Sequence, residues 1–133
     1  TALSVWTHFN EQDARFYMAE LARVLEPGGK ALVTMFLLDE AYHATLPRTG
    51  KQEARFHSTP PQRWVFDQPA YGADEWFCPG WAEVPEEAIG ITPAGLASML
   101  DGTGLTMCAH YPGNWKEIPG PFFQDVLVLK KPH

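Results

Sequence analysis

The segment LARVLEPGGKALVTMFLLDE, residues 21–40, decides the fold that the sequence predicts. An amphipathic stretch ends at Pro-Gly-Gly, residues 27–29, and KALVTMFLL, residues 30–38, follows directly. Proline cannot continue a helix, and glycine tolerates the left-handed turn that reverses the chain. The run 30–38 lacks the strict alternation of a half-buried strand. It therefore predicts a β-strand covered on both faces, as in the parallel sheets of α/β proteins.

A helix is predicted before this turn, over FNEQDARFYMAELARVL, residues 9–25. Asn10 is a suitable N-cap, and Glu11 and Asp13 place negative charge near the positive end of the helix dipole. The predicted buried stripe falls at three- and four-residue spacing and consists of Ala14, Tyr17, Leu21 and Val24 or Leu25.

The composition changes between Asp39 and Gly90, where six prolines stand among many aromatic residues. Proline at this density disfavours long helices and predicts loops with short strands, such as RWVFD at residues 63–67. A structureless loop of this length is unusual inside a compact domain, so we predict that residues 40–90 form an inserted cap or lid. The apolar mass of this insertion comes from Trp64, Phe66, Tyr71, Trp76, Phe77 and Trp81.

Regular structure is predicted again in the last third of the chain. Thr92 as N-cap, Pro93 at the first helical position and Gly102 after the end outline a short helix. The alternating sequence LTMCAHY, residues 105–111, predicts a strand, and the turn sequence PGNW follows it. QDVLVLKK, residues 124–131, predicts the final strand.

Composition and charge exclude several classes of protein. A chain of 133 residues with 45% hydrophobic and 20% charged residues suits one globular domain. A net charge of -6 with scattered basic residues argues against nucleic-acid binding. The longest apolar run is too short to span a bilayer, and no signal peptide is visible, so we expect no membrane association. Cys78 and Cys108 lack CxxC spacing, which favours a reducing compartment and predicts a cytoplasmic protein.

The order of these elements resembles the C-terminal half of a class I S-adenosylmethionine-dependent methyltransferase. The likeness is carried by SVWTHF at residues 4–9, LARVLEPGGKALVTMF at 21–36, and GLTMCAHYPGNW with FQDVLVLKK within 104–131. In that family the first segment follows the fourth strand, the second is the next helix and the fifth strand, and the third is the terminal hairpin. The resemblance implies an α/β fold with a partial Rossmann-like sheet, in which residues 1–133 form the C-terminal part of the domain and carry the Pro- and aromatic-rich insertion.

One feature of that family has no counterpart in the sequence. Its members bind the cofactor with a Gly-rich turn after the first strand, whereas Gly102-Thr103-Gly104 follows a helix and opens a strand. We therefore expect a fragment that binds S-adenosylmethionine weakly or not at all and is inactive alone. Without a fourth strand, residues 30–38 would present an unpaired apolar edge. We predict that this edge pairs with the absent N-terminal half or forms a homo-oligomer such as a homodimer.

The resemblance places candidate functional residues at the carboxyl ends of strands, where α/β sheets bind their ligands. His8 is the candidate catalytic base, because its side chain titrates near neutral pH. Trp6 and Thr7 are candidates for binding the cofactor. The alternative is that His8 and Thr7 support the following helix and that Trp6 belongs to the core.

A small-molecule acceptor would contact Phe36 and Asp39 at the end of the buried strand, although carboxylates such as Asp39 and Glu40 are more often simply solvated in loops. The candidate acceptor pocket in the insertion consists of Trp64, Tyr71, Trp76 and Trp81. These aromatic residues can instead form the insertion's own core. In the terminal hairpin we expect structural roles for Tyr111, Trp115, Gln124 and Asp125. The histidines lack metal-ligand spacing, so no metal site is predicted.

The predicted function is therefore that of the C-terminal part of a methyltransferase for a small molecule. One alternative is a noncatalytic module whose aromatic insertion binds a ligand such as a sugar or a peptide. The other is a dimerisation module.

Overall fold

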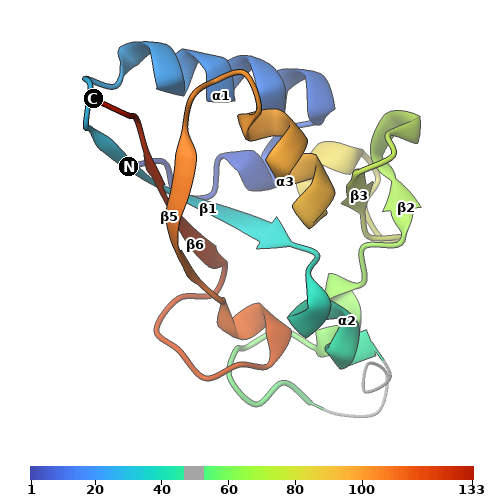
Figure 1. Ribbon diagram of the computed structural model, residues 1–133. Coiled ribbons are helices and arrows are strands. Elements are labelled where there is room, and N and C mark those ends of the chain that lie inside the picture. Colours follow the sequence, from blue (N-terminus) through green and yellow to red (C-terminus); the bar gives the residue numbers. More distant parts are fainter. Residues whose placement is uncertain (47–52) are drawn as a thin grey trace.

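The computed structural model describes residues 1–46 and 53–133 as an α/β fold, which confirms the α/β part of the predicted fold class (Figure 1). The described strands form one mixed six-stranded sheet in the order β2-β3-β4-β1-β6-β5. The strands are β1 (Lys30–Leu37), β2 (Gln68–Pro69), β3 (Trp76–Cys78), β4 (Gly90–Ile91), β5 (Thr106–Tyr111) and β6 (Asp125–Lys130). The helices are α1 (Glu11–Val24), α2 (Glu40–Thr45) and α3 (Pro93–Leu100). Short 3-10 turns are η1 (Trp6–His8), η3 (Pro61–Trp64), η4 (Ala70–Gly72), η5 (Pro85–Glu87) and η6 (Asn114–Lys116).

Helix α1 begins at the predicted cap. The Asp13 backbone N–H donates to Asn10 Oδ1 at 2.9 Å, as expected of an asparagine N-cap. At the other end, Lys131 Nζ donates to the carbonyls of Ala22 and Leu25 at 2.7 and 2.8 Å. These bonds satisfy two of the acceptors that every helix leaves free at its C-terminus. The predicted helix is confirmed, and a residue that follows β6 holds its last turn.

The buried stripe of α1 is displaced from the predicted one. Ala14, Met18 and Ala22 are the residues of the helix that are buried. Tyr17, which was predicted to be buried, is 47% exposed, so the prediction is wrong there. Of the alternatives Val24 and Leu25, Val24 is 62% exposed and Leu25 packs against the core. The small side chains of Ala14 and Ala22 allow α1 to lie close to the sheet, so a stripe at strict four-residue spacing faces the core.

Strand β1 lies in the middle of the sheet and is covered on both faces, as predicted. Val33, Met35 and Leu37 belong to the main core, together with residues of α1, α3 and β6. Phe36, whose side chain points to the opposite face, belongs to a second aromatic cluster. Thus β1 separates two cores, and the second of them lies at its carboxyl end.

Both edges of β1 have neighbours. One edge pairs antiparallel with β6 from Lys30 to Met35. On the other edge Ala2 forms a parallel bridge to β1, in which its N–H donates to the Leu32 carbonyl at 2.8 Å and its carbonyl accepts from Thr34 N–H at 3.2 Å. Farther along this edge β4 runs parallel to β1, and Leu38 N–H donates to the Ile91 carbonyl at 2.8 Å. The prediction of an open edge is therefore wrong. At these positions β1 has no unpaired edge through which two copies of the chain could associate.

The segment from α2 to β4 leaves the sheet after β1 and returns to it (Figure 1). Strand β4 pairs with β1, β3 pairs antiparallel with β4, and β2 pairs antiparallel with β3. The strand predicted at residues 63–67 is wrong, because residues 61–64 form the 3-10 turn η3. Pro60 and Pro61 fix the backbone near φ −65° and start this turn. That residues 40–90 act as a cap or lid stays a prediction.

The C-terminal elements are those predicted. Thr92 Oγ1 accepts from Gly95 N–H at 3.0 Å and caps α3, with Pro93 at its first position. Strands β5 and β6 are antiparallel neighbours, with a register shift between Met107 and Ala109. This bulge interrupts the alternation that the sequence of the edge strand β5 suggests. No helix in the described part of the chain is long and apolar enough to cross a membrane.

Candidate functional site

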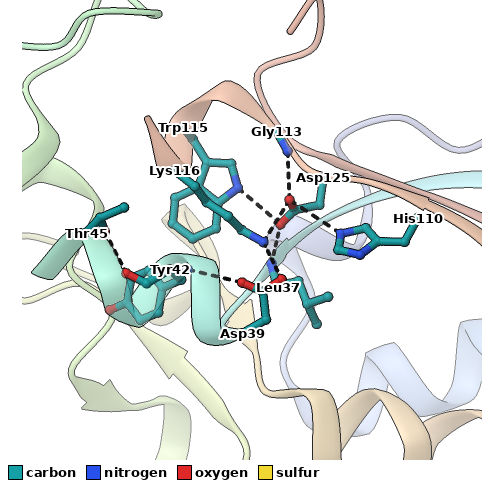
Figure 2. Close-up of polar contacts among 9 residues, drawn as sticks. All are labelled: Leu37, Asp39, Tyr42, Thr45, His110, Gly113, Trp115, Lys116 and Asp125. Atoms are coloured by element: carbon teal, nitrogen blue, oxygen red, sulfur yellow. Dashed lines mark hydrogen bonds and ion pairs between the residues drawn. The ribbon is translucent and has the colours of Figure 1, made fainter. Parts of the chain in front are cut away.

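A buried ionic network lies at the carboxyl end of β1 and connects α2, η6 and β6 (Figure 2). Lys116 Nζ lies 2.9 Å from Asp39 Oδ2 and 2.9 Å from Asp125 Oδ1. The side chains of Lys116 and Asp125 are fully buried, whereas that of Asp39 is 21% exposed. Charges removed from water are tolerated only where partners of opposite charge and hydrogen bonds surround them. The single lysine accordingly joins three separate chain segments.

Asp125 receives hydrogen bonds from three further directions. The backbone N–H of Leu37 donates to Oδ2 at 2.8 Å, and that of Gly113 donates to Oδ1 at 2.8 Å. The Trp115 indole donates to Oδ2 at 3.1 Å. Together with the Lys116 pair, these contacts engage both carboxylate oxygens, as a buried aspartate requires. The predicted structural setting of Trp115 and Asp125 agrees with these contacts.

The protonation of Asp125 follows from the same surroundings. Burial by itself raises the pKa of the Asp125 carboxyl. His110, whose Nε2 lies 3.7 Å from Oδ1, together with Lys116 and the Gly113 amide, outweighs burial, so that the pKa lies below its usual value. The carboxylate is therefore charged at neutral pH.

The stability of the fold should consequently fall in acid. Because the pKa of Asp125 is lower in the folded than in the unfolded chain, its contribution is complete above about pH 5 and is lost as the pH falls through the folded pKa. The measurement is urea unfolding followed by circular dichroism over this acid range. Asp125→Asn should show a shallower loss of unfolding free energy with acid than the unchanged protein. Identical acid slopes in the two proteins would contradict the assignment.

Asp39 has a second task beside its ion pair with Lys116. It is the N-cap of α2, where its Oδ1 accepts from the Tyr42 backbone N–H at 3.1 Å. Both carboxylate oxygens are thus engaged by the protein, although the side chain keeps some exposure. Contact between Asp39 and an acceptor molecule stays a prediction.

The second aromatic cluster surrounds Phe36. The Phe36 ring centroid lies 5.2 Å from that of Trp64, 5.2 Å from Phe66 and 5.1 Å from Trp115. Phe123 contacts the same ring edge-on at 6.0 Å. Offset and edge-to-face pairs at such spacing add to the energy of burial. Two residues predicted to bind a substrate, Phe36 and Trp64, are therefore stacked on each other.

A cavity of about 320 Å³ opens beside this cluster. Its lining includes Phe56, His57, Thr59, Trp64, Asn114 and Phe123. Apart from Trp64, none of these residues was a sequence-based candidate. No short motif marks them, because they come from the insertion and from the loop between β5 and β6.

His57 in this cavity is almost fully buried and has a polar neighbour at each ring nitrogen. Its Nδ1 lies 3.0 Å from Thr59 Oγ1, and its Nε2 lies 2.9 Å from Glu117 Oε1. The Trp64 indole donates to the same Thr59 oxygen at 2.7 Å. Because that oxygen accepts from the indole, its own proton remains available for a further hydrogen bond. Trp64 is thereby fixed by a hydrogen bond as well as by stacking.

The candidates around η1 lie in a different part of the molecule from this cavity. Trp6 is buried in the main core, and its indole donates to the Ala14 carbonyl at 3.2 Å. Thr7 is fully buried, and its carbonyl accepts from the Ile89 backbone N–H at 2.8 Å. His8 is exposed. The contacts of Trp6 agree with the core interpretation, and the proposed roles of all three residues stay predictions.

Of the other predicted pocket aromatics, Trp81 lies edge-on to Trp64 with ring centroids 6.2 Å apart, whereas Tyr71 and Trp76 are separated from Trp64. Tyr71 is 66% exposed, and its hydroxyl donates to the Glu86 carboxylate at 2.8 Å. His8 Nδ1 lies 2.8 Å from the Glu86 carbonyl oxygen, so Glu86 connects two predicted site residues. Trp76 is buried in the main core. Trp64, Tyr71 and Trp76 therefore occupy three different surroundings.

Comparison with known proteins adds no assignment. No protein-family profile matches the chain, and no solved structure matches it. Within residues 1–46 and 53–133, no group of three or more His, Cys, Asp or Glu side chains is placed to hold a metal ion. A functional conclusion must therefore come from the arrangement of the strands and from the site at the carboxyl end of β1.

Proposed function

We propose that residues 1–133 are the C-terminal part of a Rossmann-like, S-adenosylmethionine-dependent methyltransferase domain that acts on a small-molecule acceptor. The neighbours of β1 carry this proposal. Ala2 is its parallel neighbour on one edge, and β6 is its antiparallel neighbour on the other. In the methyltransferase likeness, the fifth strand lies between the parallel fourth strand and the antiparallel seventh strand. The short parallel bridge at Ala2 stands where the end of that fourth strand would lie.

The loop after Ala2 supports the same proposal. Residues 4–9 follow the parallel bridge at Ala2, and Asp39 follows β1. Both segments therefore begin where a chain segment that runs parallel to its neighbour ends. Open α/β sheets bind their ligands at such an edge. We propose His8 as a base there, with Trp6 and Thr7 lining the cofactor side and with the acceptor near Phe36, Asp39, Trp64, Tyr71 and Trp76.

The described residues do not form a complete cofactor site. A cofactor loop of this class needs a Gly-rich turn that follows a strand and opens a helix. In residues 1–46 and 53–133, Gly28 and Gly29 precede β1 instead, and Gly102 and Gly104 lie between α3 and β5. We therefore assign no catalytic step to this chain alone. The proposal places the main cofactor contacts outside residues 1–133.

Calorimetry tests directly whether the main cofactor contacts lie outside residues 1–133. S-adenosylmethionine titrated into residues 1–133 should give little or no heat, whereas the complete gene product should bind it saturably. Adenosine is the matched control ligand, because it lacks the sulfonium and the amino acid. The coding sequence upstream of Thr1 should contain a strand that ends in a Gly-rich turn. Its absence, or failure of the complete product to bind, would refute the proposal.

Noncatalytic ligand binding is the second candidate function, and the cavity lined by Trp64 and Asn114 favours it. It predicts ligand binding that does not depend on S-adenosylmethionine. A dimerisation module receives no comparable support, because the edge of β1 that would mediate it is occupied. For either candidate we propose the cytoplasm as the location, since Cys78 and Cys108 are both free thiols.

A further inference from the structure

We propose that the cavity beside Trp64 binds a neutral, planar aromatic molecule that carries a hydrogen-bond donor, with a phenol as the simplest example. That this molecule is the methyl acceptor rests on the proposed function, whereas its binding to the cavity does not. The volume of about 320 Å³ lies at the lower end of the range of ligand pockets and suits a molecule of one or two rings.

The walls of the cavity favour a flat ring. Trp64 and Phe123 both line it, and their ring centroids are 5.2 Å apart at an interplanar angle of 66°. Trp64 cannot turn freely, because it stacks on Phe36 and donates its indole N–H to Thr59. Fixed aromatic faces bind another aromatic ring without the entropy cost of ordering themselves.

The polar requirement comes from Asn114. Its side chain lines the cavity and is only 8% exposed. Nδ2 donates to the Gly120 carbonyl at 3.0 Å, which fixes the orientation of the amide. Oδ1 is buried and has no hydrogen-bond partner among the residues that the structure describes. An unsatisfied buried acceptor costs about 1–3 kcal/mol, so a ligand O–H or N–H at this oxygen would be favoured.

The charges around the cavity favour a neutral ligand. Among the residues that the structure describes, the carboxylate that lies next to His57 is that of Glu117, which is about one-tenth exposed. Its Oε2 accepts from the Arg55 backbone N–H at 3.1 Å and lies 3.4 Å from Arg55 Nε. Because the charges of Glu117 and Arg55 offset each other, this pair offers little net attraction to a ligand cation or to a ligand anion.

The test compares two ligands that differ in the hydrogen-bond donor. p-Cresol has the hydroxyl proton, and 4-methylanisole has the same ring without it. Calorimetry with residues 1–133 in the absence of cofactor should show saturable binding of p-cresol and at least tenfold weaker binding of 4-methylanisole. In two-dimensional NMR, p-cresol should shift the Trp64 indole resonance. Equal affinities, or no binding of p-cresol, would overturn the inference.

Two neighbouring phenylalanines provide matched variants. Phe123→Ala removes a wall of the cavity and should weaken p-cresol binding at least tenfold, whereas Phe122→Ala, at a side chain that is 56% exposed, should leave it unchanged. Asn114→Leu should reduce the difference between the two ligands. Equal effects of the two phenylalanine variants would contradict the assignment. Thermal unfolding establishes which variants are folded. If a variant does not fold, the comparison of p-cresol with 4-methylanisole on the unchanged protein still tests the inference.

Methyl transfer by the complete gene product separates this inference from the proposed function. If residues 1–133 bind p-cresol but the complete product neither binds S-adenosylmethionine nor methylates, the ligand site holds and the methyltransferase proposal fails. If the complete product binds S-adenosylmethionine but p-cresol does not bind, the ligand inference fails and the proposed function stands.

Discussion

Replacing Asp125 by alanine is expected to lower the free energy of unfolding by about 3–5 kcal/mol. The substitution leaves the buried Lys116 with only the partly exposed Asp39 as a partner. It also removes the acceptor for the buried donors of Leu37, Gly113 and Trp115. Each buried donor left without a partner adds its own desolvation penalty, so this single side chain should have one of the largest effects in the molecule.

Urea unfolding at pH 7, followed by tryptophan fluorescence, measures this loss. The matched control is Asp101→Ala, because Asp101 is exposed at the end of α3. It should change the unfolding free energy by no more than about 0.5 kcal/mol. A loss in Asp125→Ala as small as that of the control would show that the ionic network does not hold the three segments together.

Replacing Phe36 by alanine should have an effect of similar size, about 3–5 kcal/mol, because it empties the centre of the second aromatic cluster. Phe36 is 3% exposed, and its ring touches those of Trp64, Phe66 and Trp115. These large neighbours approach from separate segments and cannot all close the gap. The variant should therefore lose both the transfer energy of the ring and the contacts across the cavity that it leaves.

Thermal and urea unfolding check this prediction, with Phe122→Ala as the control at a half-exposed position. We expect the control to stay within about 0.5 kcal/mol of the unchanged protein. Because the Trp64 indole stacks on Phe36, its NMR resonance should also move in Phe36→Ala. Similar unfolding energies for the two variants would show that the cluster adds little to stability.

The elements that the sequence predicted correctly are those with local signals. Asn10 caps α1, Thr92 caps α3, and Pro-Gly-Gly separates α1 from β1, and each of these signals acts within a few residues. The continuous apolar character of residues 30–38 likewise requires burial on both faces wherever the strand pairs. Such patterns constrain the backbone directly, so they can be interpreted without knowing the tertiary structure.

The features that the sequence did not predict depend on distant pairings. Strands β2, β3 and β4 are two or three residues long, too short for a periodic pattern, and exist because each pairs with a neighbour. The covering of β1 by Ala2 and Ile91 could not be inferred for the same reason. Intrinsic strand propensity is weak compared with such context.

The candidate site shows even more clearly that contacts between distant segments could not be predicted from the sequence. Lysine is among the residues least often buried, so nothing marks Lys116 as the centre of a buried network. Its burial follows from its ion pairs with Asp39, which lies far away in the sequence, and with Asp125 on the strand that follows. The cavity likewise joins His57 of the insertion to Asn114 of the hairpin loop. The resemblance directed attention to the carboxyl end of β1, but only the fold placed these side chains together.

The order in which the chain is synthesised gives the central position of β1 a further consequence. On the ribosome, α1 and β1 emerge before β6, which pairs with β1 from Lys30 to Met35. Lys131, which fastens the end of α1, follows even later. Until then the nascent chain exposes an apolar strand with unpaired backbone groups, a surface that chaperones bind and that otherwise aggregates. The pairing of β1 thus waits for the synthesis of β6, and shortening the chain before β6 should leave an insoluble product.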